Sequence, residues 1–144
     1  MLNVALVALL TALQPSTPAQ PELKGQACTA PELVGTWQII DMPSMPMPGI
    51  TTVLKHVTPT HYFVVWLGAN GVVQAGHGGP YKIVNGTHTT TIEHGFGPLF
   101  EKYRGASASY QCRLSGDIWH NVGENQGMKI DEQWRRVTGT SSQR

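Results

Sequence analysis

The sequence predicts an all-β protein, a small antiparallel up-and-down β-barrel of 8–9 strands with one short helix. Apolar residues alternate in short runs, and turn signals separate these runs at intervals of roughly 8–12 residues. The chain of 144 residues contains 16 Gly and 10 Pro, as expected for many tight turns. So many short strands without helical cover must close into a barrel or form a sandwich, and consecutive hairpins favour the barrel.

Turn residues and apolar alternation together predict the individual elements. Asn85-Gly86 between β-rich runs is the strongest hairpin signal, because both residues accept the positive φ of a type I′ turn. Asn85-Gly86-Thr87 is also a glycosylation sequon, although the turn explains it without a sugar. A helical turn is expected over 98–104, where Leu99 and Tyr103 share a face. Strands are expected near residues 35–41, 50–57, 61–67, 71–76, 80–85, 87–94, 106–114, 117–122 and 128–137.

The amino terminus is typical of a secretory signal peptide. An apolar run from Leu2 to Leu13 is too short to span a bilayer and is followed by small residues, with cleavage expected after Ala19. This predicts a secreted or periplasmic protein, the alternative being a frayed apolar terminus. The expected organisation is a signal peptide over 1–19, a linker or N-terminal strap over 20–33, the barrel over 34–138 and a disordered tail over 139–144.

The chain has two cysteines, Cys28 and Cys112. In an oxidising compartment an isolated pair is more often bridged than free, so we expect a disulfide, which requires Cα atoms within about 7 Å. The alternative is two buried thiols that never meet.

Charge and motif content narrow the classes of partner. A formal net charge of +1 leaves no basic field for nucleic acid, so no nucleic-acid partner is expected. Gly76 to Pro80 precedes a strand and not a helix, so it predicts no phosphate-binding loop. We expect no cofactor and no transmembrane segment, and the sequence leaves the oligomeric state open.

The first predicted strand contains Gly35-Thr36-Trp37, which resembles the Gly-x-Trp signature of lipocalins and fatty-acid-binding proteins. Such barrels keep a basic residue on the last strand that stacks on this Trp. The resemblance implies that Arg135 or Arg136 lies over Trp37 as a cation–π pair that closes the barrel floor.

The stretch 55–136 resembles a family of bacterial lipocalin-like (calycin) domains of unknown function. At the positions where that family tends to carry Tyr and Glu, this chain has His88 and Thr90, and His94 replaces a usual aromatic residue. The resemblance implies the fold and a pocket but no established activity. It rests on Lys55 to His61, Gly78 to Tyr81, Ile92-Glu93, Gly116 to His120 and Lys129 to Trp134.

Period two on the predicted strand 87–94 places His88, Thr90, Ile92 and His94 on one face, which suits the interior of a partly wet pocket. Histidine can orient a ligand, transfer protons or bind a metal. The alternative is that these histidines are hydrogen-bonded wall residues. The candidate ligand-binding residues are His61, Tyr81, His88, Thr90, His94, His120 and Glu132, and no catalytic or metal-ligating residue is assigned.

The leading hypothesis is non-catalytic binding of a small, mostly apolar or amphipathic molecule inside the barrel, in a cavity of at least about 300 Å³. A second is a barrel enzyme in which His61, His120 and a carboxylate converge for proton transfer. A third is copper binding through the thioethers of Met42, Met45 and Met47. A fourth is a structural envelope protein that presents a surface.

Overall fold

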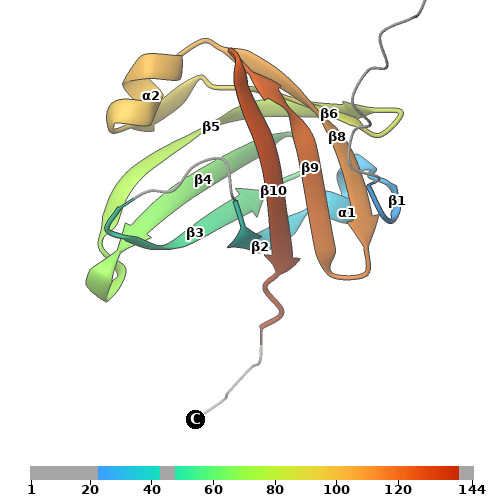
Figure 1. Cartoon of the computed structure of the whole chain (residues 1–144), viewed down its shortest axis with the longest axis horizontal. Coiled ribbons are helices and arrows are strands. Elements are labelled where there is room, and N and C mark those ends of the chain that lie inside the picture. Colours follow the sequence, from blue (N-terminus) through green and yellow to red (C-terminus); the bar gives the residue numbers. More distant parts are fainter. Residues whose placement is uncertain (1–22, 43–47, 140–144) are drawn as a thin grey trace, which may run out of the picture.

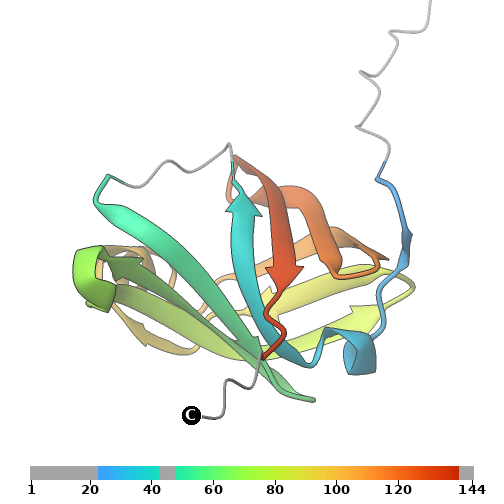
Figure 2. The ribbon, with the colours of Figure 1, turned by 90° about the horizontal axis from the view of Figure 1, so that it is seen from below.

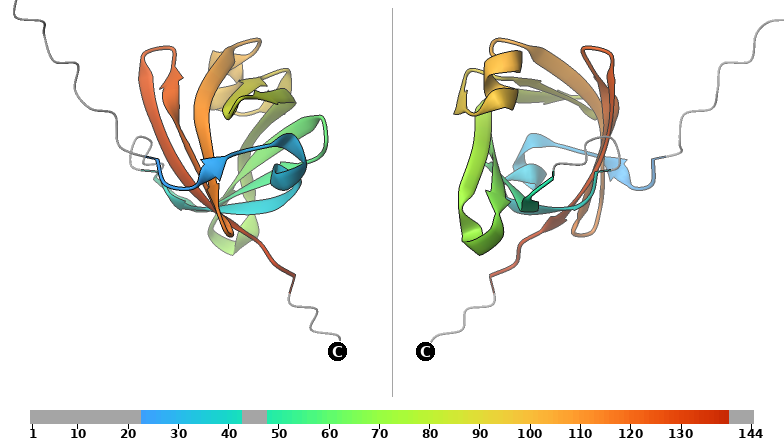
Figure 3. Two further views of the ribbon diagram at one scale, coloured as in Figure 1. Left: turned by 90° about the vertical axis from the view of Figure 1, so that its right-hand side faces the viewer. Right: turned by 60° about the vertical axis from the view of Figure 1, so that its left-hand side comes forward.

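Eight antiparallel strands close into a barrel in the computed structural model, which describes residues 23–42 and 48–139 (Figures 1 and 3). Each strand pairs with the next barrel strand along the chain, and β10 returns to β2, which closes the ring. The barrel strands are β2 (Gly35–Asp41), β3 (Ile50–Val57), β4 (His61–Gly68), β5 (Val73–Val84), β6 (Thr87–Thr91), β8 (Ser107–Ser115), β9 (Ile118–Asn125) and β10 (Met128–Arg136).

Two short strands, two short α-helices and the 3-10 helix η1 (Ala69–Gly71), between β4 and β5, decorate this barrel. Strand β1 (Gln26–Ala27) pairs with β8 on the outside, and β7 (His94–Phe96) pairs with β5. Helix α1 (Ala30–Leu33) follows β1, and α2 (Pro98–Tyr103) lies against β5 and β7 on the other side of the barrel (Figure 1). The predicted all-β, calycin-like barrel is therefore confirmed, and the helix expected over 98–104 is present.

Two predicted strands, 71–76 and 80–85, are one long strand, β5. The glycine-rich stretch between them, where no strand was predicted, permits close packing. A side chain at Gly78 would collide with the carbonyl of Tyr62, and one at Gly79 with the carbonyl of Thr91. The ring of Phe63 covers Gly76 and Gly78 from outside, so these glycines keep the strand continuous where β5 passes between its neighbours.

The strand predicted over 87–94 ends early, at Thr91, and His94 begins the separate strand β7. The backbone N–H of Ile92 donates to the Ala106 carbonyl, and that of Glu93 to the Gly78 carbonyl, so the chain turns between two partners. The segment expected as a strap contains β1 and α1. The predicted signal peptide, positions 43–47 and residues 140–144 lie outside the described residues.

The disulfide between Cys28 and Cys112 is confirmed, with Cα atoms 5.5 Å apart. The backbone N–H of Cys28 donates to the Cys112 carbonyl at 3.3 Å, which continues the pairing of β1 with β8. Figure 3 shows this segment crossing the outer wall before it reaches α1. The bond therefore ties the N-terminal segment to the barrel.

Trp37, on β2, and Arg136, on β10, close the barrel floor. Figure 2 shows α1 leading into β2, which lies beside β10. Trp37 is fully buried and its indole N–H donates to the Leu33 carbonyl at 2.8 Å. The Arg136 guanidinium carbon lies 4.1 Å from the centre of the Trp37 ring, and its N–H groups donate to the carbonyls of Glu32 and Val34 at 2.5 and 3.0 Å. The predicted cation–π pair is confirmed for Arg136, whereas Arg135 is exposed.

Replacing Arg136 by Ala should lower the free energy of unfolding by about 2 kcal/mol, because charged hydrogen bonds to two carbonyls and a ring contact are lost. Arg135→Ala removes the same charge from an exposed position and should change it by less than about 0.5 kcal/mol. Urea unfolding with the disulfide intact measures both. Equal effects of the two substitutions would contradict the role of Arg136 in closure.

Replacing both Cys28 and Cys112 by Ala should cost about 4.5 kcal/mol, because the bond closes a loop with a sequence separation of 84. Urea unfolding of the double variant and of the oxidised parent gives the difference. A loss below about 1 kcal/mol would show that the N-terminal segment contributes little to the barrel.

Candidate ligand-binding cavity

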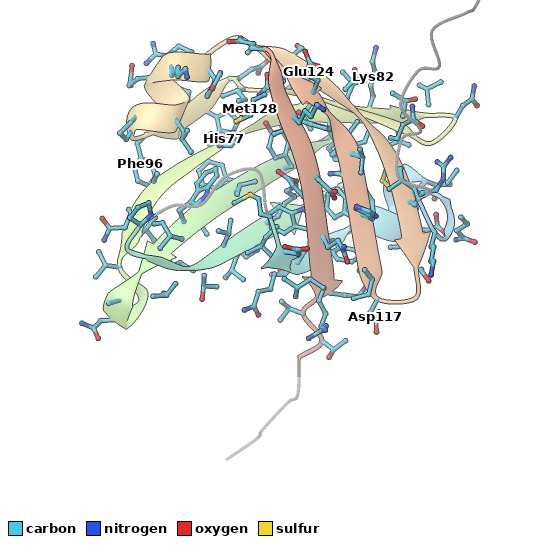
Figure 4. The ribbon with its side chains drawn as sticks, viewed as in Figure 1. His77, Lys82, Phe96, Asp117, Glu124 and Met128 are labelled. Atoms are coloured by element: carbon cyan, nitrogen blue, oxygen red, sulfur yellow. A yellow bond between two sulfur atoms is a disulfide. The ribbon has the colours of Figure 1, made fainter. Side chains whose placement is uncertain are left out.

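A cavity lies inside the barrel, above the tryptophans of the floor and below α2 and the β9–β10 turn. Its wall includes Trp134 at one end and Leu99, Tyr103 and Met128 at the other. In Figure 4, His77 lies within the ring of strands, whereas Lys82 and Asp117 project from its outside. The cavity volume is about 70 Å³, below the 300 Å³ expected for an ordinary ligand site. The expectation of a large apolar pocket is therefore not met, and the space suits a compact molecule.

A buried ion pair forms the bottom of the cavity. Lys55 alternates with Val53 and Val57 on the inner face of β3, and only 6% of its surface is exposed. Its Nζ lies 3.3 Å from Oε2 of Glu132, which also accepts the indole N–H of Trp134 at 2.9 Å. This pairing compensates two charges that would otherwise be costly to remove from water.

The ammonium group of Lys55 also rests on aromatic faces. Its Nζ lies 3.8 Å from the centre of the Trp134 ring and 4.5 Å from that of Trp119. Burial lowers the pKa of Lys55, while the charge of Glu132 and its hydrogen bond raise it. The ring contacts and the carboxylate thus stabilise the charged amine inside the barrel.

Two histidines line the cavity, of which His88 is buried and His77 is partly buried. His77, on β5, stacks on Trp66 with ring centres 5.0 Å apart and meets Tyr62 edge-on at 6.0 Å. His88, on β6, is 2% exposed and contacts Trp119 edge-on at 5.4 Å. Burial, and then the positive charge of Lys55, lowers the pKa of His77 to about 4 and that of His88 to about 3. Both rings are therefore neutral at neutral pH.

Four buried polar atoms on the cavity wall have no hydrogen-bond partner among the residues that the structure describes. They are Nε1 of Trp66, Nδ1 of His77, Nδ1 of His88 and Oδ1 of Asn125. Since buried polar groups are almost always hydrogen-bonded, each of these atoms has an unused capacity to bond a molecule or a water inside the barrel. The fifth such atom, Nδ2 of Asn121, belongs to a residue that does not line the cavity.

Among the residues predicted from sequence, His88, Thr90 and Glu132 line the cavity. Tyr81 is also inside the barrel, but its hydroxyl donates to the Thr58 carbonyl at 2.9 Å and its ring packs edge-on against His88 at 5.5 Å. Tyr81 therefore supports His88 from below and does not reach the cavity.

His61, His94 and His120 do not reach the cavity, contrary to expectation. His61 is exposed and bonds to the hydroxyl of Thr60 at 2.9 Å. Because β6 ends at Thr91, the alternation of inward and outward side chains does not continue to His94. The exposed ring of His94 stacks on Phe63.

His120 alternates with Trp119 and Asn121, both of which are buried inside, so its ring points outward, 2.7 Å from Oδ1 of Asp131. His61 lies on β4, which pairs with β5, whereas His120 lies on β9, which pairs with β10. The two histidines therefore do not share a cleft with a carboxylate. The convergence required for a His/carboxylate enzyme is thus not formed.

Two central residues of the cavity, Lys55 and His77, were missed as site residues from the sequence. Lys55 carried a usable signal, because a lysine in phase with Val53 and Val57 must occupy the apolar face of its strand. His77 stands between Gly76 and Gly78, in a stretch that lay between two predicted strands. Its inward position depends on the unexpected continuity of β5.

The copper hypothesis depended on a methionine loop of which only Met42 is described, and Met42 lines the cavity. Met45 and Met47 lie outside the described residues. Within 23–42 and 48–139, no three His, Cys, Asp or Glu side chains gather in a way that could hold a metal ion. The described helices are all too short or too polar to cross a membrane.

Comparison with known proteins shows similarity in fold only. No protein-family model and no curated protein sequence matches the chain. Among solved structures, the chain is similar to a mutant of the fluorescent protein UnaG, with 10% identity, a TM-score of 0.44 and coverage of 77% of this chain and 100% of that one. It is also similar to the REP1-NXSQ fatty acid transporter, with 8% identity, a TM-score of 0.44 and coverage of 76% and 98%.

Acidification should destabilise the barrel through His77 and His88. Their pKa values in the folded state, about 4 and about 3, lie below the value of 6.5 in the unfolded chain. Between these values the unfolded chain binds protons that the folded barrel excludes. The free energy of unfolding should therefore fall as pH falls below 6.5, by up to about 1.4 kcal/mol per pH unit for each histidine.

Urea unfolding between about pH 7 and about pH 5 measures this dependence. His77→Phe keeps the stacked ring and should flatten the slope. His94→Phe, on the outer surface against Phe63, is the matched control and should leave the steeper slope in place. An unchanged slope in His77→Phe would show that His77 does not contribute to the pH dependence.

Proposed function

We propose that this protein binds a compact, amphipathic small molecule inside the barrel and carries out no chemistry on it. The single observation that supports this function is the set of four unpartnered polar atoms on residues that line the cavity, whose other side chains are mostly aromatic or aliphatic. Natural structures leave few such atoms buried without a purpose. Apolar walls with a few polar atoms are also the usual composition of small-molecule sites.

The proposed binding residues combine those expected from sequence with those that the fold adds. His88, Thr90 and Glu132 come from the first group, and Lys55 and His77 from the second. The polar atoms fix the orientation of the ligand, and the rings provide the apolar contact that drives its transfer from water.

The entrance side of the cavity can adapt to its ligand. Met42 and Met128 line the wall, and their unbranched thioether side chains change shape at little cost. Leu99 and Tyr103 from the two-turn helix α2 complete this side. These side chains can move aside to admit a ligand somewhat larger than the cavity volume in this structure. A long acyl chain would require the barrel wall itself to move.

We further propose that the chain is exported. The apolar segment 1–19 has the pattern of a signal peptide. The disulfide between Cys28 and Cys112 fits an oxidising compartment, where such bonds persist. A soluble ligand carrier or sensor outside the cytoplasm is the role that agrees with both features.

Binding can be tested with three planar probes of the same size and shape, namely benzamide, benzoate and benzamidine. We expect at least one of them to shift the indole N–H signal of Trp66 in a ¹H–¹⁵N NMR spectrum. The other three tryptophans have indole N–H groups already bonded to Leu33, Asn121 and Glu132, so their signals should move less.

Ala108→Leu fills the cavity from β8 and should abolish that shift, because the added side chain takes the space of the probe. Ser109→Leu adds the same side chain to the exposed outer face of the same strand and should preserve it. Failure of all three probes to move the Trp66 signal, or movement that persists in Ala108→Leu, would refute interior binding.

A further inference from the structure

The cavity contains its own balanced pair of charges. Among the lining side chains that the structure describes, Lys55 and Glu132 are the two that carry charge at neutral pH, because His77 and His88 are neutral. The pair sums to zero whichever of the two residues holds the shared proton. The interior therefore has no net charge that would attract an ion of either sign.

Both charges of the pair already have partners within the protein. Oε2 of Glu132 receives both Nζ of Lys55 at 3.3 Å and the indole N–H of Trp134 at 2.9 Å. The Trp134 face that could hold a cationic ligand already carries the Lys55 ammonium, 3.8 Å from the ring centre. An acidic ligand would have to displace Glu132 from Lys55, and a basic ligand would have to displace Lys55 from Glu132 and the ring.

The free polar atoms of the wall specify a complementary pattern on the ligand. The indole N–H of Trp66 can only donate a hydrogen bond, so it requires an acceptor. Oδ1 of Asn125 can only accept, so it requires a donor, and Nδ1 of His77 and of His88 can do either according to the tautomer. An amide or a hydroxylated ring has both the acceptor that Trp66 requires and the donor that Asn125 requires.

We infer that the ligand is a neutral molecule bearing both a hydrogen-bond donor and an acceptor, and that the Lys55–Glu132 pair excludes acids and amines from the cavity. This inference rests on the proposed binding function and names its ligand class. The pair is thus a specificity determinant: it contributes to the selection of the ligand by charge, while Trp66 and Asn125 contribute to its orientation.

The probes benzamide, benzoate and benzamidine test the inference, because they share one planar shape, and at neutral pH only benzamide is both neutral and able to donate and accept a hydrogen bond. In the wild-type protein, benzamide should bind at least about tenfold more tightly than benzoate or protonated benzamidine. The reason is that binding of a charged probe would break one buried polar interaction, and such a loss weakens binding by about this factor. Titrations followed through the Trp66 indole signal give the three dissociation constants.

Breaking the pair should reverse this preference in a direction set by the remaining charge. Glu132→Gln leaves Lys55 uncompensated and keeps an acceptor for the Trp134 indole, so benzoate should become the preferred probe. Lys55→Met leaves Glu132 uncompensated, so protonated benzamidine should become preferred. The double variant Lys55→Met/Glu132→Gln should restore the preference for benzamide.

Asp131→Asn is the matched control, because it removes one negative charge from the neighbouring position on the outer face and should leave the order of the probes unchanged. Equal or tighter binding of benzoate or benzamidine by the wild type would overturn the inference while leaving interior binding intact. If no probe binds, the proposed function fails and the inference fails with it. The wild-type order alone decides the matter even if a single variant does not fold.

Discussion

Closure of the sheet is the constraint on which every other feature of this protein depends. When β10 returns to β2, the inner faces of eight strands become one interior, and the open edges that would invite association disappear. Trp37 and Arg136 stabilise this junction, since the guanidinium stacks on the ring and bonds to the backbone that leads into β2. The cavity exists only because the ring is complete.

Closure also determines the electrostatics of the interior. Once Lys55 is enclosed, its charge must be compensated locally, and Glu132 together with the faces of Trp119 and Trp134 provides that compensation. The same enclosure, with the charge of Lys55, holds His77 and His88 neutral. A single buried cation therefore influences the acid sensitivity of the fold, and we propose that it also influences the kind of molecule that the cavity accepts.

The fold was predicted more completely than the site. Alternation and turn chemistry located most strands and the helix at Pro98–Tyr103, because both are local properties of the chain. Site prediction required knowing which side chains of each strand point inward. A single break or extension of a strand is enough to reverse the alternation of inward and outward side chains beyond it. His94 lost its expected inward position when β6 ended at Thr91, while His77 gained one when β5 continued through the glycines.

The sequence by itself determined the fold class through local patterns, and it favoured a disulfide because the chain has only two cysteines. The stacking of Arg135 or Arg136 on Trp37 was implied by the resemblance to lipocalin-like barrels. Only the tertiary structure decided that Lys55 meets Glu132 across the barrel, 77 positions away in the chain, and that the remaining space is small. The physical reason is that partners across a closed sheet are set by register and by packing of side chains from many strands, and neither is encoded within any single segment.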